Sequence, residues 1–294
     1  HEISEEEAQS AMIAILLHDI GHGPFSHSLE RIIIDNIDHE FITGQYFVDL
    51  NNYFDNKLEN AIKIFNNQYH KKYLHQLISS QLDVDRLDYL RRDSFFSGVS
   101  EGIIGSDRII KMLNVVDNEL VIEEKGIYSV EKFLTASRLM YWQVYLHKTS
   151  LVAEQLVTRL LKRAKELIRE GIKIEASSAL NYFLNSTVSK ENINNETLAL
   201  FAKLDDYDII SAMKSWQSDE DFVLSTISKM LLNRDLLRIE IQNQEFSKDK
   251  IKNAKKDLML RFQALIMMLN IYFLKWVIIF YLLKFLLHLH LNKL

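Results

Sequence analysis

The segment that decides the fold reads LHDIGHGPFSH and spans residues 17–27. It carries three histidines, one aspartate and the only proline of the chain. Neutral imidazoles and carboxylates are the usual nitrogen and oxygen ligands of Mn²⁺, Fe²⁺, Zn²⁺ and Mg²⁺. Because the glycines and the proline of this segment break a helix, we expect the later histidines, His22 and His27, to fold back over the cavity faced by His18 and Asp19.

The residues before this segment predict the helix that leads into it. Ser4 and Glu7 have the spacing of a capping box at a helix N-terminus. Apolar residues then recur at helical spacing and continue to Asp19; they are Ala8, Ala11, Met12 and Ile15. A carboxylate on an apolar helix face is costly unless something pairs it. Asp19 therefore favours a metal or catalytic site over the alternative, a plain helix C-terminus where the dipole favours histidine.

The composition bounds the class of protein. Of 294 residues, 48% are hydrophobic and 26% are charged, which excludes disordered and fibrous chains. One proline and eight glycines favour long helices over a loop-rich β architecture. The absence of cysteine excludes disulfides and thiolate metal sites and fits a reducing compartment, so we expect a cytoplasmic protein. The net charge of −5 disfavours a generic nucleic-acid coat.

The pattern along the chain predicts a mainly α fold with a small β excursion. Helices are expected from about residue 40 to 113 and over 130–170. Between 114 and 129, short apolar runs around the turn signal Asp117-Asn118 indicate the β excursion. A polar stretch from Asn185 to Thr197 indicates a loop or subdomain boundary. The predicted divisions are a core over 1–184, a C-terminal helical subdomain over 185–257 and an apolar tail over 258–294.

The apolar tail has no acidic residue after Asp257. Its longest uncharged run, Leu265 to Leu274, is shorter than the ~20 residues that a spanning helix needs. We therefore expect a buried or oligomer-interface segment rather than a membrane anchor. A change of reading frame stays open as an alternative, because such Leu/Phe/Ile monotony is unusual at the end of a folded domain.

The 17–27 segment resembles the signature of the HD-domain metal-dependent phosphohydrolases. More narrowly, it is similar to their dNTP triphosphohydrolase branch, which includes bacterial dGTPases and the mammalian SAM-and-HD-domain enzyme. Two more segments support this: DVDRLDYLRRD at 83–93 resembles the late metal-aspartate helix of that branch, and YLHK at 145–148 resembles a substrate-side helix. The resemblance spans roughly residues 1–240. It implies an HD-domain helical bundle, a divalent metal ion (Mn, Mg, Fe or Zn), a nucleotide substrate and assembly into homodimers or larger oligomers.

The resemblance also implies a role for each matching residue. The metal ligands would be His18, Asp19 and Asp85. The catalytic residues would be His27 with its acidic partner Glu30, and His22 and His39 at the phosphates. The substrate-binding residues would be Arg86 and Lys148 at the phosphates, Tyr89 and Asp93 at the sugar, and Tyr145.

Helical spacing supports part of this independently. Asp85, Tyr89 and Asp93 lie four residues apart and would share one helix face. Tyr141, Tyr145 and Lys148 (with Arg138) also share a face by 3–4 spacing, although core tyrosines with a solvated basic rim would give the same pattern. His75 has no carboxylate partner at ligand spacing and is expected on the surface or in the core.

One departure affects the metal site. The family places a first metal histidine on a helix well before its His-Asp pair, and this sequence begins after that position. We expect that the sequence is truncated; the alternative is an incomplete site. The resemblance implies hydrolysis of a deoxynucleoside triphosphate to deoxynucleoside and triphosphate. The alternatives are an HD-type phosphodiesterase or nucleotidase, and a nucleotide-binding protein with a degraded site.

Overall fold

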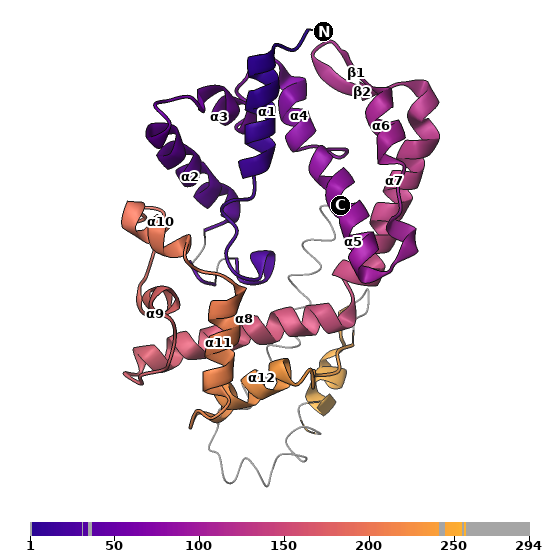
Figure 1. The fold of residues 1–294 in the computed structure, drawn as a ribbon. Helices are drawn as coiled ribbons and strands as arrows, with labels where there is room; N and C mark the ends of the chain where they lie inside the picture. Colours follow the sequence, from indigo (N-terminus) through magenta and orange to yellow (C-terminus); the bar gives the residue numbers. More distant parts are fainter. Residues whose placement is uncertain (1, 31, 35–36, 241–244, 255, 257–294) are drawn as a thin grey trace. The chain divides into compact units, whose positions relative to one another are not determined.

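The computed structural model describes residues 2–30, 32–34, 37–240, 245–254 and 256. It is mainly helical with one small hairpin, as predicted (Figure 1). The chain divides into two compact units, His1–Leu237 and Arg238–Leu294. The predicted division after residue 184 stays a prediction, and the apolar tail lies outside the described residues. All the elements named below belong to the first unit.

Four N-terminal helices pack on one another and form the first core. They are α1 (Glu5–Leu17), α2 (His39–Tyr53), α3 (Glu59–Phe65) and α4 (Lys72–Ile78). Figure 1 shows α1, α3 and α4 side by side, and each contacts the other two. Their core centres on Ala14, Phe47, Ile64 and Leu74, all at most 1% exposed. This core fixes the end of α1, which is followed by His18, and the start of α2 at His39.

The predicted capping box of the first helix is present. Glu7 N–H donates to Ser4 Oγ at 3.2 Å, and Ser4 N–H donates to Glu7 Oε2 at 2.9 Å. The Glu7 carboxylate also accepts hydrogen bonds from Lys71 Nζ at 2.7 Å and Tyr69 Oη at 3.1 Å. These bonds, led by the one from Lys71, lower the pKa of Glu7 to about 2. The same carboxylate thus caps α1 and ties it to the segment before α4.

The predicted apolar stripe on this helix is correct only in part: Ala11 and Ile15 pack partly buried against the core, but Ala8 and Met12 are exposed. The buried residues of α1 are Glu7, Ser10 and Ala14, whereas Met12 is 62% exposed. The helix ends at Leu17 with His18 as its C-cap, so Asp19 lies beyond the helix and not on a buried face. Hydrogen bonds of Glu7 with Tyr69 and Lys71 help to decide which face of α1 is buried. A hydropathy pattern does not contain this information.

A second group of elements forms around its own core. The helices are α5 (Val84–Ser97), α6 (Ser106–Met112) and α7 (Ile127–Met140), with short 3₁₀ turns at Ser100–Gly102 (η2) and Glu124–Gly126 (η3). A further 3₁₀ turn, η1 (Ser26–Ser28), lies outside this group, between α1 and α2 in the chain. Leu90, Ile109, Phe133 and Met140 fill the core between them. α5 begins with Asp83 as N-cap and ends at Gly98, whose φ of 73° only glycine adopts readily.

The predicted β excursion is a two-stranded antiparallel hairpin. Strand β1 (Leu113–Val116) pairs with β2 (Glu119–Ile122), with Val116 opposite Glu119. The turn residues Asp117 and Asn118 have φ of 50° and 66°, the left-handed pair that a two-residue hairpin turn requires. The hairpin is shorter than the predicted 114–129, because residues 124–126 turn and 127 begins α7.

The predicted continuous helix over 130–170 is interrupted. After α7 the backbone forms one π turn at Tyr141–Tyr145 and then leaves the helix. His147 is extended, and its side chain caps a new helix, α8 (Lys148–Arg169), by accepting from Thr149 N–H at 3.3 Å. A π turn adds a residue per turn and so rotates the following side chains off the expected face. Tyr145 and Lys148 therefore do not share one helix face, contrary to the prediction.

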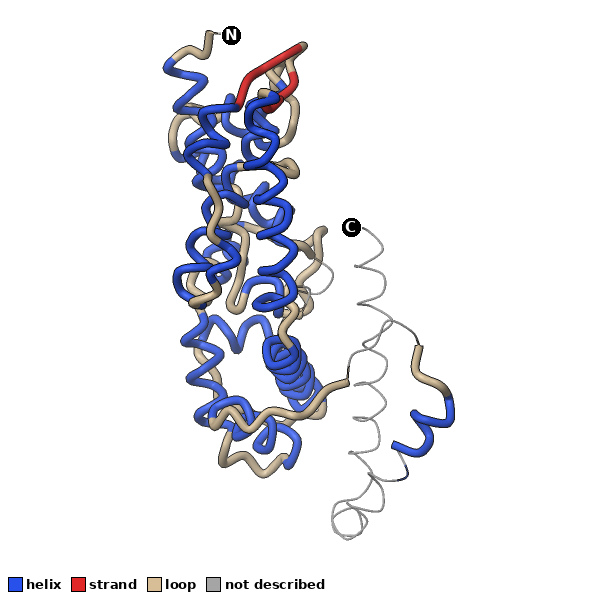
Figure 2. Tube along the Cα trace, turned by 90° about the vertical axis from the view of Figure 1, so that its right-hand side faces the viewer, coloured by secondary structure: helices blue, strands red, loops and turns tan. Residues whose placement is uncertain are grey.

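The remaining helices surround α8. They are α9 (Ser178–Asn185), α10 (Asn195–Phe201), α11 (Asp206–Trp216) and α12 (Phe222–Leu232). α8 packs on α9 and α12, and α10 reaches back to α2 (Figure 1). Figure 2 shows the helices in blue and the two strands of the hairpin in red. The loop expected over 185–197 is present between α9 and α10. Arg163 of α8 is buried and donates to Asp221, the N-cap of α12, at 2.8 Å, which joins the two helices.

Candidate active site

One cavity of about 1290 Å³ collects most of the predicted site residues. Its walls come from the end of α1, the loop after it, the start of α2, the start and middle of α5, and the π turn with the start of α8. Ten predicted residues line it: His18, Asp19, His22, His27, His39, Asp85, Arg86, Tyr89, Asp93 and Tyr145. Segments up to 136 positions apart in sequence, from His18 to Glu154, thus line one cavity, which is larger than the roughly 300–1,000 Å³ that is usual for small-molecule sites.

The three predicted metal ligands converge in this cavity. His18 Nδ1 lies 2.6 Å from the Ile15 carbonyl oxygen, so it carries the proton and donates it. His18 Nε2 then has a free lone pair, 3.4 Å from Asp19 Oδ2 and 3.8 Å from Asp85 Oδ1. A backbone carbonyl that fixes the tautomer of a histidine in this way is typical of metal-ligating imidazoles.

The charges of this donor set also fit a divalent cation. Asp19 and Asp85 face the same imidazole nitrogen. The pKa of Asp85 is raised, mainly by burial and further by the neighbouring Asp19 charge, while His18 acts to lower it. Two carboxylates held together repel each other unless a cation lies between them. One nitrogen and two oxygens match the ligands of Mn²⁺, Fe²⁺, Zn²⁺ and Mg²⁺. The residues present therefore fit the implied metal.

A close backbone approach brings α1 and α2 together here. Gly21 N–H donates to Thr43 Oγ1 at 3.0 Å, and Thr43 Oγ1 donates to the His18 carbonyl at 3.1 Å. A Cβ on residue 21 would lie 2.2 Å from the His39 carbonyl oxygen, so only glycine fits. This contact places His18, at the end of α1, and His39, at the start of α2, on the same cavity wall.

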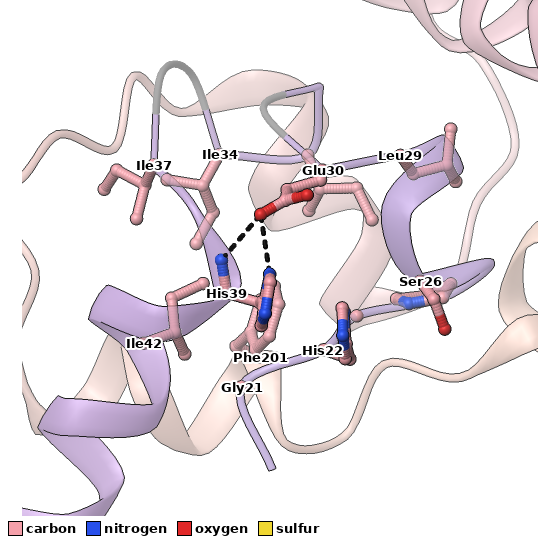
Figure 3. A pocket seen from close by; sticks show the side chains of 13 residues that line it. Gly21, His22, Ser26, Leu29, Glu30, Ile34, Ile37, His39, Ile42 and Phe201 are labelled. Carbon is pink, nitrogen blue, oxygen red and sulfur yellow. Dashed lines mark hydrogen bonds and ion pairs between the residues drawn. The ribbon is translucent and has the colours of Figure 1, made fainter. Parts of the chain in front are cut away.

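Glu30 organises the histidines on the other side of the cavity. Its Oε1 accepts from His39 N–H at 2.9 Å and from His39 Nδ1 at 2.8 Å (Figure 3). Its Oε2 lies 3.1 Å from His27 Nδ1. Figure 3 shows the carboxylate above His39, with Ile34 and Ile37 beside it. One carboxylate thus holds two imidazoles by their Nδ1 atoms. The His39 Nε2 atom lies 4.0 Å from Asp19 Oδ1.

The hydrogen bonds decide the charge of Glu30. Burial raises its pKa, but the bonds from the His39 backbone, the His39 ring and the His27 ring together lower the pKa to about 2. Glu30 is therefore ionised throughout the physiological range, as an orienting base requires. The sequence predicted its pairing with His27 and did not predict its pairing with His39.

His22 completes a cluster of three imidazoles. Its ring stacks on His39 with centroids 4.0 Å apart and meets His27 edge-on at 4.6 Å. Burial, and then the nearby His39, lower the pKa of His22 to about 4, so it is a neutral hydrogen-bond partner in the free protein.

The spacing of these three rings would by itself suit a cation, since one nitrogen from each lies within 4.8 Å of the others. The set of His18, Asp19 and Asp85 carries two carboxylates and so balances a divalent charge better. On this criterion the His18–Asp19–Asp85 set is the better candidate for a cation site.

A polar stripe on α5 faces the cavity opposite the histidines. Asp85, Tyr89 and Asp93 all line the cavity, as their spacing predicted. Tyr145 Oη donates to Asp93 Oδ2 at 2.6 Å. Burial is the largest cause that raises the pKa of both Tyr89 and Tyr145, so both stay hydroxyl donors. A tyrosine hydroxyl and a carboxylate side by side suit a sugar hydroxyl.

Arg86 and Lys148, the two cationic side chains predicted to bind phosphates, lie in different places. Arg86 lines the cavity, and its Nε donates to the Ser80 carbonyl at 3.1 Å and to Asp83 Oδ2 at 3.3 Å. Its remaining guanidinium N–H groups are the ones open to a ligand. Lys148 is exposed at the first residue of α8 and is not among the cavity-lining residues.

Sequence patterns missed several lining residues. Glu154 and Ser150 of α8 line the cavity, and Glu154 is half-buried. Burial raises the pKa of Glu154 against the opposing, lowering effect of the nearby His27. His75 also lines the cavity, with Nδ1 2.9 Å from the Ile64 carbonyl oxygen. No spacing rule connects these side chains to the motif, because each arrives through tertiary packing.

Comparison with known proteins identifies two regions of the chain. A match to the HD domain covers residues 1–93, and a match to an HD-associated region covers residues 104–180. The chain contains an HD domain. Within it lie all three residues of the proposed metal set, at 18, 19 and 85.

Relatives of this HD-domain chain are longer than the chain itself. The crystal structure of a phosphohydrolase from Bacteroides thetaiotaomicron matches with a TM-score of 0.85 and 49% identity, covering 89% of this chain and 65% of that one. The uncharacterised YwfO of Bacillus subtilis is 35% identical over 84% of this chain and 57% of its own length. Human deoxynucleoside triphosphate triphosphohydrolase SAMHD1 is 25% identical over 67% of this chain and 39% of its own length. The chain thus spans less than two thirds of each of these relatives.

None of the helices in the described part of the chain combines the length and the apolar character needed to cross a bilayer.

Proposed function

We propose that this HD-domain chain is a metal-dependent phosphohydrolase that converts a deoxynucleoside triphosphate to deoxynucleoside and triphosphate. The observation that carries the proposal is the convergence, in one cavity, of the His18–Asp19–Asp85 set with the Glu30-oriented imidazoles. Support for the phosphohydrolase class comes from the relative of that description at 49% identity. Support for the dNTP substrate comes from the distant SAMHD1 relatives.

His18, Asp19 and Asp85 would hold the divalent cation. Bound there, it would supply Lewis acidity at a phosphate oxygen and lower the pKa of water. The reaction joins a water oxygen to the α-phosphorus and breaks the bond from that phosphorus to the 5′-oxygen of the nucleoside. The departing 5′-oxygen then needs a proton.

His27 is the residue placed to supply that proton. Its Nδ1 is engaged by Glu30 at 3.1 Å, so its Nε2 is the atom that faces the cavity. An ionised Glu30 stabilises the protonated ring, because opposite charges favour one another at this distance. His39, held at Nδ1 by the same carboxylate, and His22 donate from their other faces to the phosphoryl oxygens.

The opposite wall binds the nucleoside. Asp93 Oδ2 already accepts from Tyr145, which leaves its other carboxylate oxygen to accept from a sugar hydroxyl. Tyr89, whose ring meets Tyr145 edge-on at 6.0 Å, contributes a second hydroxyl to this wall. Arg86 reaches the phosphates between the two walls. We also propose that the chain assembles into a homo-oligomer, as the family resemblance implies.

A product assay tests the proposal. The full chain is incubated with each dNTP, with and without Mn²⁺, and the products are separated by anion exchange. The expected products are inorganic triphosphate and deoxynucleoside, formed only with metal. Release of orthophosphate or of a nucleoside monophosphate instead would identify a nucleotidase or phosphodiesterase and contradict the substrate assignment.

A matched pair of α5 variants isolates the metal set. Asp85→Asn removes one predicted ligand, whereas Asp88→Asn changes a carboxylate on the same helix that is 68% exposed and does not line the cavity. Metal content and turnover should fall together in Asp85→Asn and should be unchanged in Asp88→Asn. If Asp85→Asn keeps its metal and its activity, the proposed site is wrong.

A further inference from the structure

The backbone just before His27 has an unusual conformation. Phe25 has φ of 55° and ψ of 21°, and Ser26 has φ of 46°, so two consecutive residues with side chains are left-handed. This region is unfavourable for residues that carry a Cβ, and it persists only where surrounding contacts enforce it. The conformation sets the direction of the η1 turn that carries His27.

Two contacts hold this conformation, and one of them is local: Ser26 N–H donates to the Gly23 carbonyl at 3.0 Å and closes a turn with Pro24 and Phe25 at its centre. The other contact comes from far along the chain. Phe25 N–H donates to Asp206 Oδ1 at 2.8 Å, across 181 positions of sequence. Asp206 is the first residue of α11, but it does not cap that helix. The capping carboxylate is Asp205, which accepts from Tyr207 N–H and Asp208 N–H. The Asp206 carboxylate is therefore available to accept the hydrogen bond from the loop that carries His27.

Two further hydrogen bonds hold the same loop from α8. Thr158 Oγ1 donates to the Ser28 carbonyl at 3.0 Å, and Lys165 Nζ donates to the Ile33 carbonyl at 3.2 Å. Both act after His27. Of these long-range contacts, the one from Asp206 acts before His27 and directly on the left-handed residues.

We propose that Asp206 is a positioning residue for His27: it holds the left-handed Phe25–Ser26 backbone and thereby aims the His27 ring into the cavity. The effect on turnover rests on the proposed function, in which His27 protonates the leaving oxygen. The effect on the loop does not, because it concerns only the backbone hydrogen bond. The proposal also gives a role to α11, which lies beyond the two matched regions.

Two variants at this position separate the hydrogen bond from the charge. Asp206→Ala removes the acceptor, and we expect kcat to fall about tenfold with KM changed less than twofold, because a misplaced proton donor affects the chemical step. Asp206→Asn keeps an oxygen at the same place, and its kcat should stay within about threefold of the wild type. Metal content should be unchanged in both, since neither touches His18, Asp19 or Asp85.

The control is Glu196→Ala. Glu196 is an exposed carboxylate in the first turn of α10, so its loss removes a similar helix-dipole interaction without any contact to the loop. Hydrogen exchange of the Phe25 amide gives a readout that does not depend on activity. It should accelerate at least tenfold in Asp206→Ala and stay unchanged in Asp206→Asn and Glu196→Ala.

The outcomes are distinguishable. Unchanged exchange at Phe25 in Asp206→Ala, unchanged kcat, or an equal loss of kcat in Asp206→Asn would each overturn the positioning role. If the Ala variant does not fold, a folded Asn variant with tenfold lower kcat would overturn it, and one with near wild-type kcat and Phe25 exchange would support it. If the wild type hydrolyses no nucleotide, the proposed function fails, and the exchange measurement still decides whether Asp206 holds the loop.

Discussion

Replacing Glu30 with glutamine tests how much of the site depends on one carboxylate. Glu30 accepts three hydrogen bonds, from the His39 backbone, the His39 ring and the His27 ring. Its pKa of about 2 lies well below the ordinary value of 4.5. At 1.36 kcal/mol per unit, this difference corresponds to about 3 kcal/mol of stability. Because the side chain is partly exposed, we discount this to about 2 kcal/mol.

The pH dependence follows from the direction of the shift. A carboxylate whose pKa is lowered by folding stabilises the protein above its unfolded pKa, and the contribution is lost as pH falls through the folded pKa. For Glu30 the contribution is complete above about pH 4.5 and disappears towards pH 2. At pH 7, Glu30→Gln should lower Tm by about 4–8 °C, since about 2–4 °C per kcal/mol is typical for this size. The difference in Tm between the variant and the wild type should narrow between pH 5 and pH 3.

The assay is thermal unfolding followed by circular dichroism at several pH values, together with turnover. Turnover should fall by about 10²-fold or more, because both histidines lose their orienting partner, while metal content stays the same. Glu59→Gln is the control, since Glu59 is 61% exposed and pairs only with Lys63 on α3. A Glu30→Gln variant with wild-type Tm, or a Tm gap that does not narrow in acid, would refute the reasoning.

Further substitutions probe the other walls. Gly21→Ala should destabilise the protein by about 3 kcal/mol in urea unfolding, because the added Cβ meets backbone at 2.2 Å; a loss below 1 kcal/mol would contradict the close approach. Tyr145→Phe removes the hydroxyl bound to Asp93 and should raise KM about fivefold, with unchanged Tm as the check on folding. Arg86→Ala should raise KM for the triphosphate about tenfold and Lys148→Ala clearly less, in steady-state kinetics; the reverse order would move the phosphates towards α8.

Most of the predicted site residues line the cavity, and they could be selected from the sequence because they are concentrated in short segments. Residues 17–27 and 83–93 supply the metal set and the α5 stripe, and helical periodicity alone places Asp85, Tyr89 and Asp93 on one face. The hairpin was predictable for a similar reason, since Asp117-Asn118 is a local turn signal.

Other features depend on contacts between distant elements and could not be predicted. The Glu30–His39 pairing needs α2 to begin beside the loop, and that approach depends on Gly21 fitting against His39. Asp19 was selected for the wrong reason: it lies beyond the end of α1 and 48% exposed, not on a buried stripe. The π turn that ends at Tyr145, and the break in the helix before Lys148, have no marker in sequence periodicity.

The central claim is that one divalent cation binds between His18, Asp19 and Asp85. Anomalous diffraction from crystals of the full chain grown with Mn²⁺ tests it most directly. We expect one strong peak within bonding distance of His18 Nε2 and of an oxygen from each aspartate. A peak among the rings of His22, His27 and His39 instead, or no peak in the cavity at saturating Mn²⁺, would contradict the account.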